Sequence, residues 1–465
     1  MSKKIGLGSN RVRSVGIGVL PLLFFSCVSY QAEPVELSAL LSQLERTKVK
    51  DLLAKRGEEK KAALGIRDAV LLALRANPGL RAFRAQLKVA KLGVEAAGLF
   101  PDIELGWDAM DVVATETTGG KAEAEQFLSG LGLSFRLPRP GELSAEKDFA
   151  RAKSEEASQT LLEAQWRLAL QTSFAWLRVK RMEAALKFQE EALKNAGRLA
   201  DFFVQAREMG AATSMEKNLA LAEQAKIQAE FIRQKGEEQR ARRKLNLLLG
   251  VSPEERFPLE GIPGGLWDDT KGGMSLLCKK ALELRPDLGR LMARYQQAEE
   301  SLRLEIAKQW PGLWIGTGIT LSLPLFSGFN GPQIDVAKAL REKRREDLLA
   351  AVHRVRAEIA EALARKNQAN QVWDVLKTRL LPAAEQNLKV LREAFDSGRV
   401  TLLETLIGQR QIIDARLQEL DARVERLEAS LSLRWACGDI SLGLDSLIKT
   451  EGKKEETKKT KEGGK

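Results

Sequence analysis

The chain has 465 residues, of which 44% are hydrophobic and 29% are charged, a composition typical of long helices and coiled coils. Its formal net charge of +11 gathers at the two ends: seven Lys face four Glu between residues 449 and 465, and the start includes Lys3, Lys4, Arg11 and Arg13. The remaining charge is spread along the chain. This distribution disfavours nucleic-acid binding, which needs a basic patch.

The first 26 residues have the features of a secretory signal peptide. Basic residues precede the apolar run Val15–Phe25, which is shorter than the about 20 residues that span a bilayer. A small residue followed by Cys27 resembles the bacterial lipobox, in which the Cys is acylated after the leader is removed. We therefore predict a signal peptide over 1–26, lipidation at Cys27 and a lipid-anchored segment over 27–64. An ordinary signal peptide cut nearby is the alternative.

The chain contains an internal duplication. Three pairs of segments match, the first at an offset of 208 (286 − 78) and the others at 188 (322 − 134): Ala73–Leu80 with Ala281–Leu288, Leu133–Leu137 with Leu321–Leu325, and Ala206–Thr213 with Ala394–Thr401. Each copy is predicted to hold a helix of about thirty residues, a short stretch with strand character, a very long helix, a Gly-centred break and another long helix. The second copy lacks about twenty residues between its first and second matched segments.

We predict a mainly α-helical fold with a small β portion. In the last helix, apolar residues alternate at spacings of 4 and 3 from Ile413 to Leu431, which is a coiled-coil seam. A helix of about fifty residues is roughly 75 Å long, a length that suits paired antiparallel helices. The predicted domains are a first repeat over 65–256, a linker over 257–274, a second repeat over 275–440 and a disordered Lys/Glu-rich tail over 441–465.

The residue types that catalysis and metal binding require are scarce. His353 is the single histidine, and its helix of charged and apolar residues favours a surface imidazole. Cys278 and Cys437 could pair, but we favour two partly buried thiols. The glycine pairs lack the Lys-Ser/Thr that follows a phosphate-binding loop. We therefore predict no enzyme, no cofactor and no metal site.

The segments with strand character differ in length between the copies. A membrane-spanning strand takes about 9–11 residues. Residues 101–134 have room for two such strands, whereas residues 311–322 have room for one. The second hairpin is therefore either very short or does not cross a membrane. Trp107, Trp310 and Trp314 flank the predicted strands, and we expect them either at a membrane interface or in helix packing.

Four features together resemble the TolC-like outer membrane efflux protein family over about residues 65–440. They are the helix opening Ala-Leu-x-x-Asn-Pro-x-Leu at residues 73–80, the strand-to-helix junction Leu-Ser-Leu-Pro-Leu-Phe-Ser-Gly at residues 321–328, the two Gly-x-x-Thr turns and the duplication itself. The stretch Pro324–Gly331 is similar to the heavy-metal (cobalt–zinc–cadmium) branch of this family.

This resemblance implies duplicated helical hairpins whose few strands join those of two other copies in a trimeric outer-membrane β-barrel. The homotrimer would be the exit duct of a tripartite efflux system and would pass small molecules or metal ions passively. The implied partners are a periplasmic adaptor, an inner-membrane pump of the resistance-nodulation-division type and outer-membrane lipid, with most of the chain in the periplasm. The alternatives are a periplasmic adaptor or a structural coiled-coil lipoprotein without a channel.

The resemblance also implies roles for the turns between the long helices. A periplasmic adaptor would dock at a tip formed by Gly210, Thr213, Gly398, Val400 and Thr401. Local structure is the other explanation, in which Gly ends one helix and Thr caps the next, and both can hold. Glu216 and Glu404 lie three residues beyond each Thr. In a trimer they would form negative rings near the closed tunnel entrance, or they would be solvated helix carboxylates.

Overall fold

The computed structural model describes residues 30–45, 48–49, 63–107, 131–262, 272–316, 318–397 and 399–439. The chain divides into two units, Met1–Arg46 and Thr47–Lys465, and each is described by itself. The described part of the first unit, residues 30–45, contains the short helix α1 (Leu37–Glu45), whose leucines are exposed. The predicted signal peptide, Cys27 and the tail 441–465 lie outside the described residues.

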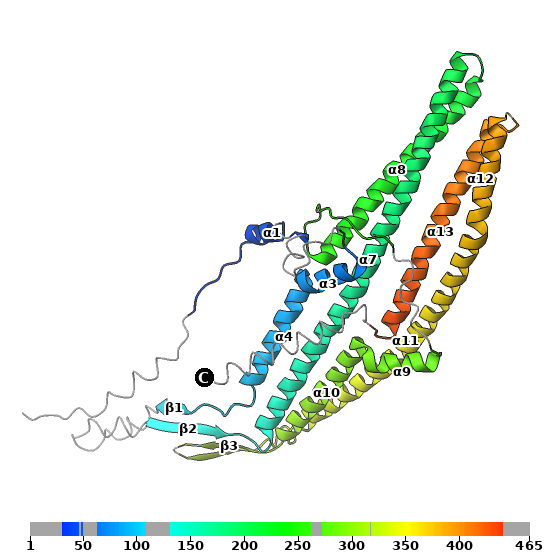
Figure 1. Cartoon of the computed structure of the whole chain (residues 1–465). Coiled ribbons are helices and arrows are strands. Elements are labelled where there is room, and N and C mark those ends of the chain that lie inside the picture. Colours follow the sequence, from blue (N-terminus) through cyan, green and yellow to red (C-terminus); the bar gives the residue numbers. More distant parts are fainter. Residues whose placement is uncertain are drawn as a thin grey trace, which may run out of the picture. The chain divides into compact units, whose positions relative to one another are not determined.

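In the second unit the same order of elements occurs twice, and the unit is mainly α-helical with a four-stranded sheet (Figure 1). The first set is α3 (Ile66–Ala76), α4 (Pro78–Ala96), β1 (Glu104–Trp107), β2 (Leu131–Leu137), α7 (Glu142–Glu208) and α8 (Ser214–Leu249). The second set is α9 (Met274–Leu284), α10 (Pro286–Ala307), β3 (Gly312–Ile315), β4 (Ile319–Ser322), α11 (Gly331–Val375), the π-helical segment η2 (Leu376–Leu380), α12 (Leu381–Asp396) and α13 (Leu402–Ala436).

Two long helical hairpins carry the unit. The helix α7 has 67 residues, so it is roughly 100 Å long, and α8 returns antiparallel against its far half. The second hairpin is formed by α12 and α13. The turns of both hairpins lie at one end of the unit, and the strands lie at the other end (Figure 1).

The sheet has the strand order β1-β2-β3-β4, and every neighbouring pair is antiparallel. Phe135 of β2 lies opposite Ile315 of β3, which joins the two repeats through one sheet. The second hairpin is very short, as one of the two alternatives left open by the sequence predicts. Its strands have four residues each, and a bond of 2.9 Å from the Gly316 N–H to the Gly318 carbonyl closes the turn.

A proline divides the first predicted helix of each copy into two. Pro78 and Pro286 each stand at the first position of a new helix, where the missing N–H costs nothing. The residue before a proline is disfavoured in helical geometry, so Asn77 and Arg285 are extended in ψ and break the chain direction. The predicted helix of about thirty residues is therefore a bent pair in both copies.

The same contact closes this break in both copies, with different side chains. The Asn77 Nδ2 donates to the Leu248 carbonyl at 2.9 Å, and the Arg285 Nη1 donates to the Ala436 carbonyl at 3.1 Å. The two acceptors are equivalent residues, since 436 − 248 = 188. Each long helix then ends on a left-handed glycine, Gly250 or Gly438, at which a Cβ atom would strike the backbone of the break.

Arg285 is the most extensively bonded of these residues. Its side chain is 2% exposed and lies 5.3 Å from the centroid of Trp166 and 5.4 Å from that of Trp435. It forms ion pairs of 2.7 Å with Asp287 and with Glu358. One guanidinium therefore connects the α9–α10 break to α7, α11 and α13.

The two largest apolar clusters of the described residues form most of the core. The larger one joins α3, α7, α8 and α13 around Trp176, whose indole N–H donates to the Leu64 carbonyl at 3.0 Å. The smaller one joins α9, α11 and the end of α13. The predicted coiled-coil seam of α13 supplies the larger cluster with Leu420, Val424 and Leu427, and Leu433 of the same helix is buried in the smaller one.

A π-helical segment interrupts the second long helix at η2. Pro382 follows directly and has no N–H to continue the α-helical bonds, which accounts for the change of winding. Just before it, Trp373 lies between Lys377 and Arg426, whose cationic groups are 4.5 and 4.3 Å from the ring centroid. The Trp373 N–H donates to Glu419 at 3.2 Å, so the ring holds this point to α13.

Among the described residues, each helix is too short or too polar to cross a bilayer.

The first prediction concerns Arg285. Replacing it with Met leaves Asp287 and Glu358 without their partner and the Ala436 carbonyl without its donor, so we expect a loss of about 3 kcal/mol of stability. Thermal unfolding followed by circular dichroism would measure it. Arg303→Met is the matched control, because Arg303 is largely exposed and pairs with Glu300 within its own helix. Equal unfolding temperatures for the two variants would contradict the assignment.

Candidate functional site

The turn between α7 and α8 is built by two standard helix-end motifs. Gly210 is left-handed, with φ of 74°, and ends α7. Its N–H donates to the Arg207 carbonyl at 3.2 Å, and the Ala211 N–H donates to the Ala206 carbonyl at 2.7 Å, which is the Schellman pattern. Thr213 then begins α8 as its N-cap. The turn is thus closed by its own backbone, with Gly210 required for its conformation.

Thr213 and Glu216 form a reciprocal capping box. The Glu216 N–H donates to the Thr213 hydroxyl at 3.2 Å, and the Thr213 N–H donates to the Glu216 carboxylate at 2.8 Å. Two helix N–H groups that α8 cannot satisfy internally are paired in this way. The spacing Thr-x-x-Glu is a sequence signature of this motif, and it could have identified the structural role of the acid in advance.

The turn between α12 and α13 repeats this construction. The Arg399 N–H donates to the Ala394 carbonyl at 2.8 Å, as Ala211 does to Ala206 in the first turn. Thr401 and Glu404 form the second capping box, with bonds of 2.7 and 3.3 Å. Gly398, the counterpart of Gly210, lies outside the described residues. Val400 is half-buried and Thr401 is exposed.

Both acids are held in the charged form. The hydrogen bond from the Thr213 backbone, followed by that from its hydroxyl, lowers the pKa of Glu216. Thr401 lowers the pKa of Glu404 through the same two bonds. The N-terminal end of each helix also favours a negative charge there. Each turn therefore carries a fixed, solvent-exposed carboxylate at neutral pH.

The two turns are joined by a small apolar cluster. Phe203 of α7, Ala220 of α8 and Leu402 of α13 are buried in it, with Phe395 of α12 packed alongside. Further along, Arg181 of α7 pairs with Asp421 of α13 at 2.8 Å. The two hairpins thus meet through an apolar contact at the tip and an ion pair nearer the middle.

Exposed apolar side chains border the turns of both hairpins. Met209 and Met215 on either side of the first turn are 77% and 78% exposed. Leu403 and Ile407 of α13 are about half exposed. Methionine side chains adapt to varied partners, and exposed apolar groups beside a rigid turn are typical of a protein-binding surface.

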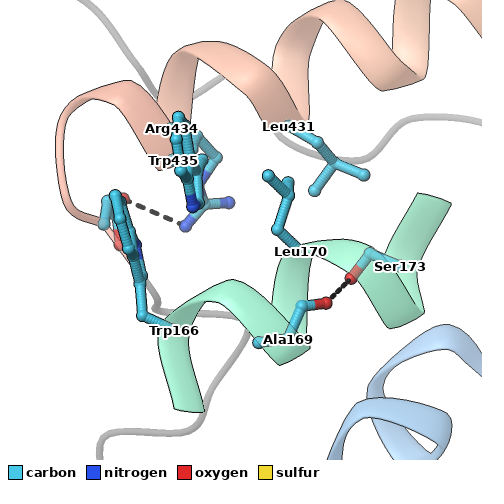
Figure 2. Close-up of a pocket in the computed structure, with 8 residues that line it drawn as sticks. Trp166, Ala169, Leu170, Ser173, Leu431, Arg434 and Trp435 are labelled. Atoms are coloured by element: carbon cyan, nitrogen blue, oxygen red, sulfur yellow. Dashed lines mark hydrogen bonds and ion pairs between the residues drawn. The ribbon is translucent and has the colours of Figure 1, made fainter. Parts of the chain in front are cut away.

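An aromatic pair, Trp166 of α7 and Trp435 of α13, packs the two hairpins against each other, and only a small cavity remains beside it. Trp166 and Trp435 stack with ring centroids 4.2 Å apart and an angle of 11° (Figure 2). The cavity beside them, lined also by Leu170, Ser173 and Leu431, has a volume of about 30 Å³. This volume is on the scale of water molecules, so the cavity cannot hold a cofactor or an organic substrate.

The described residues contain no cluster of three His, Cys, Asp or Glu side chains that could hold a metal ion. Cys278 and Cys437 are free thiols, the first half-buried and the second buried. Burial raises the pKa of the Cys437 thiol, which keeps it protonated. His353 is exposed on α11.

The predicted interface tryptophans lie near the strands. Trp310 is half exposed at the end of α10, and Trp314 is half-buried in β3. Trp107 ends β1, and its side chain lies outside the described part. None of the three joins the helical tip, which lies at the opposite end of the unit.

Comparison with known proteins identifies the family. Residues 70–251 and 314–439, more than half of the chain, match the family described as outer membrane efflux protein. The chain belongs to the outer membrane efflux protein family. This family and its fold are those of channel proteins.

Two curated members of the outer membrane efflux protein family are similar over most of their length. The cobalt-zinc-cadmium resistance protein CzcC of Cupriavidus metallidurans is 22% identical over 391 residues, which cover 80% of this chain and 89% of CzcC. The pyoverdine export outer membrane protein OpmQ of Pseudomonas putida is 25% identical over 404 residues, which cover 77% of this chain and 82% of OpmQ.

A solved structure has the same fold. The CmeC outer membrane channel of Campylobacter jejuni superposes with a TM-score of 0.68 at 15% identity, over 83% of this chain and 89% of CmeC. The family expected from the sequence and its helical-hairpin architecture are therefore confirmed.

The second prediction concerns the capping boxes. Thr213→Ala and Thr401→Ala each remove a side-chain acceptor at a helix start, so we expect each to cost about 1 kcal/mol of local stability. Hydrogen exchange followed by mass spectrometry should be faster in the peptides that cover residues 209–217 or 397–405. Thr160→Ala is the control, because the Thr160 hydroxyl bonds a carbonyl within α7.

The same caps should weaken in acid. The folded-state pKa of Glu216 and of Glu404 lies below the unfolded value, so their stabilisation is complete above the ordinary carboxyl range. It is lost as the pH falls through the lowered values. Unchanged exchange in the threonine variants, at neutral and at acid pH, would contradict the capping roles.

Proposed function

We propose that this chain is the outer-membrane exit duct of a tripartite efflux system, passive itself and energised by an inner-membrane pump. The observation that carries the proposal is the pair of long hairpins ending in exposed apolar turns, in a chain of the outer membrane efflux protein family. A helix of roughly 100 Å has the length of a conduit across the periplasm rather than of a globular core.

A trimer is the proposed assembly. In the described residues β1 and β4 each have one free edge, and an open edge in lipid leaves costly unpaired backbone groups. Val89 of α4 and Val336 of α11 are both about 70% exposed, on the two helices that border the unit beside the strands. Joining the α11 and β4 side of one copy to the α4 and β1 side of the next would bury both surfaces and close the sheet.

The partners are proposed from the two ends of the hairpins. A periplasmic adaptor would dock on the tip that contains Gly210, Thr213, Gly398, Val400 and Thr401, where the turns are rigid and the neighbouring side chains are apolar. The pump would be of the resistance-nodulation-division type. Acylation of Cys27 would anchor the mature chain to the outer membrane, since more than one acyl chain gives stable attachment.

The cargo is proposed to be a small molecule or a metal ion. CzcC is a cobalt-zinc-cadmium resistance protein and OpmQ a pyoverdine export protein, so relatives of similar identity differ in cargo. The stretch Pro324–Gly331 favours the metal-ion branch. A duct need not bind its cargo tightly, and it therefore needs no ligand cluster.

The third prediction tests the duct directly. The purified full-length protein should sediment as a trimer in detergent and should open steady ionic conductance in planar lipid bilayers. A trimer that opens no conductance, or a chain that stays monomeric, would instead support the structural coiled-coil lipoprotein.

The fourth prediction tests the acids at the tip. Glu216→Gln with Glu404→Gln removes six charges from a trimer, while Gln still accepts the capping bond, so the helices should remain intact. We expect the cation preference of the conductance to fall toward that of the bulk electrolyte, because rings of acids select cations. Glu342→Gln, an exposed acid on α11, is the control and should leave the selectivity unchanged. Equal selectivity in all three proteins would remove these acids from the conduction path.

A further inference from the structure

One segment of the chain has no charge over an unusual length. Residues 309–334 include no Asp, Glu, Lys or Arg, although these make up 29% of the chain. The segment contains β3, β4 and the connection to α11, and Lys308 and Asp335 stand at its two ends. Segments that face water or a charged partner usually contain charged residues. The absence of charge over residues 309–334 therefore indicates an apolar partner.

The connection from β4 to α11, residues Leu323–Asn330, is called the junction loop here. Its apolar side chains point outward: Phe326 is fully exposed, and Leu325 and Phe329 are 57% and 51% exposed. Trp310 lies at the same end of the hairpin, because Gly312 pairs with Ser322 and both segments leave the sheet there. Together they form a contiguous apolar end to the second hairpin.

The backbone holds the junction loop in this conformation. Gly328, Phe329 and Asn330 all have positive φ, of 56°, 53° and 63°. A left-handed Phe costs roughly 1–2 kcal/mol, so the surroundings must enforce it. The Phe329 N–H donates to the Pro324 carbonyl at 2.9 Å, and the Asn330 Nδ2 donates to the Glu305 carbonyl at 2.8 Å. The phenyl rings are therefore displayed by a fixed turn.

The duplicated first copy provides an internal comparison. Its equivalent turn, at an offset of 188, has Pro138 where the second copy has Phe326. There Arg136 and Arg139 pair with Glu142 at 3.2 and 3.4 Å, and Glu142 is almost fully buried. Burial by itself raises the pKa of Glu142, but the hydrogen bond from the Arg139 backbone and the two guanidinium groups together outweigh it, so the pKa is lowered. The same strand-to-helix junction can thus be made with charges turned inward, so the fold does not require exposed phenyl rings.

We propose that the junction loop is a lipid anchor that places Leu325, Phe326 and Phe329 in the acyl region of the membrane leaflet nearest the helices. This proposal rests on the proposed outer-membrane location. Strands of four residues extend about 14 Å, well below the apolar band of about 25 Å in outer-membrane proteins. The loop lies where these strands meet the helices, so it belongs at the near interface. Burial of the phenyl rings there would hold this end of the chain in the leaflet.

The trimer contact proposed above uses the free edge of β4 and the exposed Val336 of α11, and a second copy fits the loop between them less well. The contacts between helices in this chain include ion pairs, as between Arg294 and Glu156 or between Arg341 and Glu299. The junction loop offers none, and its most exposed residue projects beyond the surface. The acyl region of a lipid bilayer is uncharged and fluid, so it can bury the exposed phenyl rings without a complementary charge or surface. Lipid is therefore the partner that fits the junction loop.

Depth-dependent quenching tests the anchor. Phe326→Cys in a full-length chain with Cys278→Ser and Cys437→Ala would be labelled with the fluorophore NBD. The same chain without Phe326→Cys measures any label taken up at Cys27, and this signal is subtracted. The protein would be reconstituted in vesicles of phosphatidylethanolamine and phosphatidylglycerol. We expect several-fold brighter, blue-shifted emission, strong quenching by nitroxides on the upper acyl chain and weak quenching by aqueous iodide.

Two labelled controls define the scale. Met209→Cys is exposed at the helical tip and should be quenched by iodide alone. Pro140→Cys lies in the equivalent turn of the first copy and should be quenched by nitroxides less than Phe326→Cys. Unfolding temperatures equal to that of the cysteine-substituted parent establish that each variant folds.

Two outcomes would overturn the anchor. Iodide quenching at position 326 equal to that at position 209 would place the loop in water. Protection from both quenchers, together with a loss of protection on dissociation to monomers, would place it between copies. Fractionation of the cells that produce the Phe326→Cys protein, before purification and labelling, reports separately on the proposed function. A protein that reaches the outer membrane, and whose label is later found exposed to water, contradicts the anchor alone.

Discussion

Burial along α7 is the constraint on which the rest of the second unit depends. This one helix packs against α4 on the side of the strands, against α3 near its middle, against α8 toward the tip, and against α10 and α13 of the other repeat. Two paired helices of this length do not enclose a hydrophobic core by themselves. The apolar face of each helix is therefore buried against a neighbouring helix. The stacked pair Trp166–Trp435 and the Arg285 guanidinium lie where three of these helices meet.

Much of this arrangement could be predicted from local patterns. The spacing of apolar residues in α13 identified the buried face of its C-terminal half, where Leu420, Val424 and Leu427 are core residues. Toward the tip, Ile412 is buried instead of the predicted Ile413. The Gly-x-x-Thr spacing placed both turns, whereas the breaks at Pro78 and Pro286 were not predicted, although the prolines themselves could have indicated them. These features depend on residues a few positions apart, and such residues determine caps, breaks and periodicity directly.

The rest depends on residues that are distant in sequence. Nothing near Trp166 indicates that it stacks on Trp435, and nothing near Arg285 indicates that Glu358 and the Ala436 carbonyl complete its bonds. The capping role of Glu216 was within reach of the sequence, because the acid and Thr213 are three residues apart. Both repeats have the same backbone arrangement because of the duplication. The hydrogen bond at the helix break is nevertheless donated by different side chains, Asn77 in the first copy and Arg285 in the second.

The π-helical turn at η2 changes the direction in which the side chains of α12 face, about the helix axis, relative to those of α11. One residue in an α-helix corresponds to about 100° of rotation and 1.5 Å of rise. Before the turn, Val355 and Ile359 of α11 face the smaller core cluster, and after it Leu391 of α12 is in close contact with Gly408 of α13. Gain or loss of a single amino acid at η2 would therefore re-aim the whole of α12 while scarcely altering the length of the hairpin. An insertion or deletion at this point can therefore rotate the tip end of α12 about its axis while the packing of the other helices is unchanged.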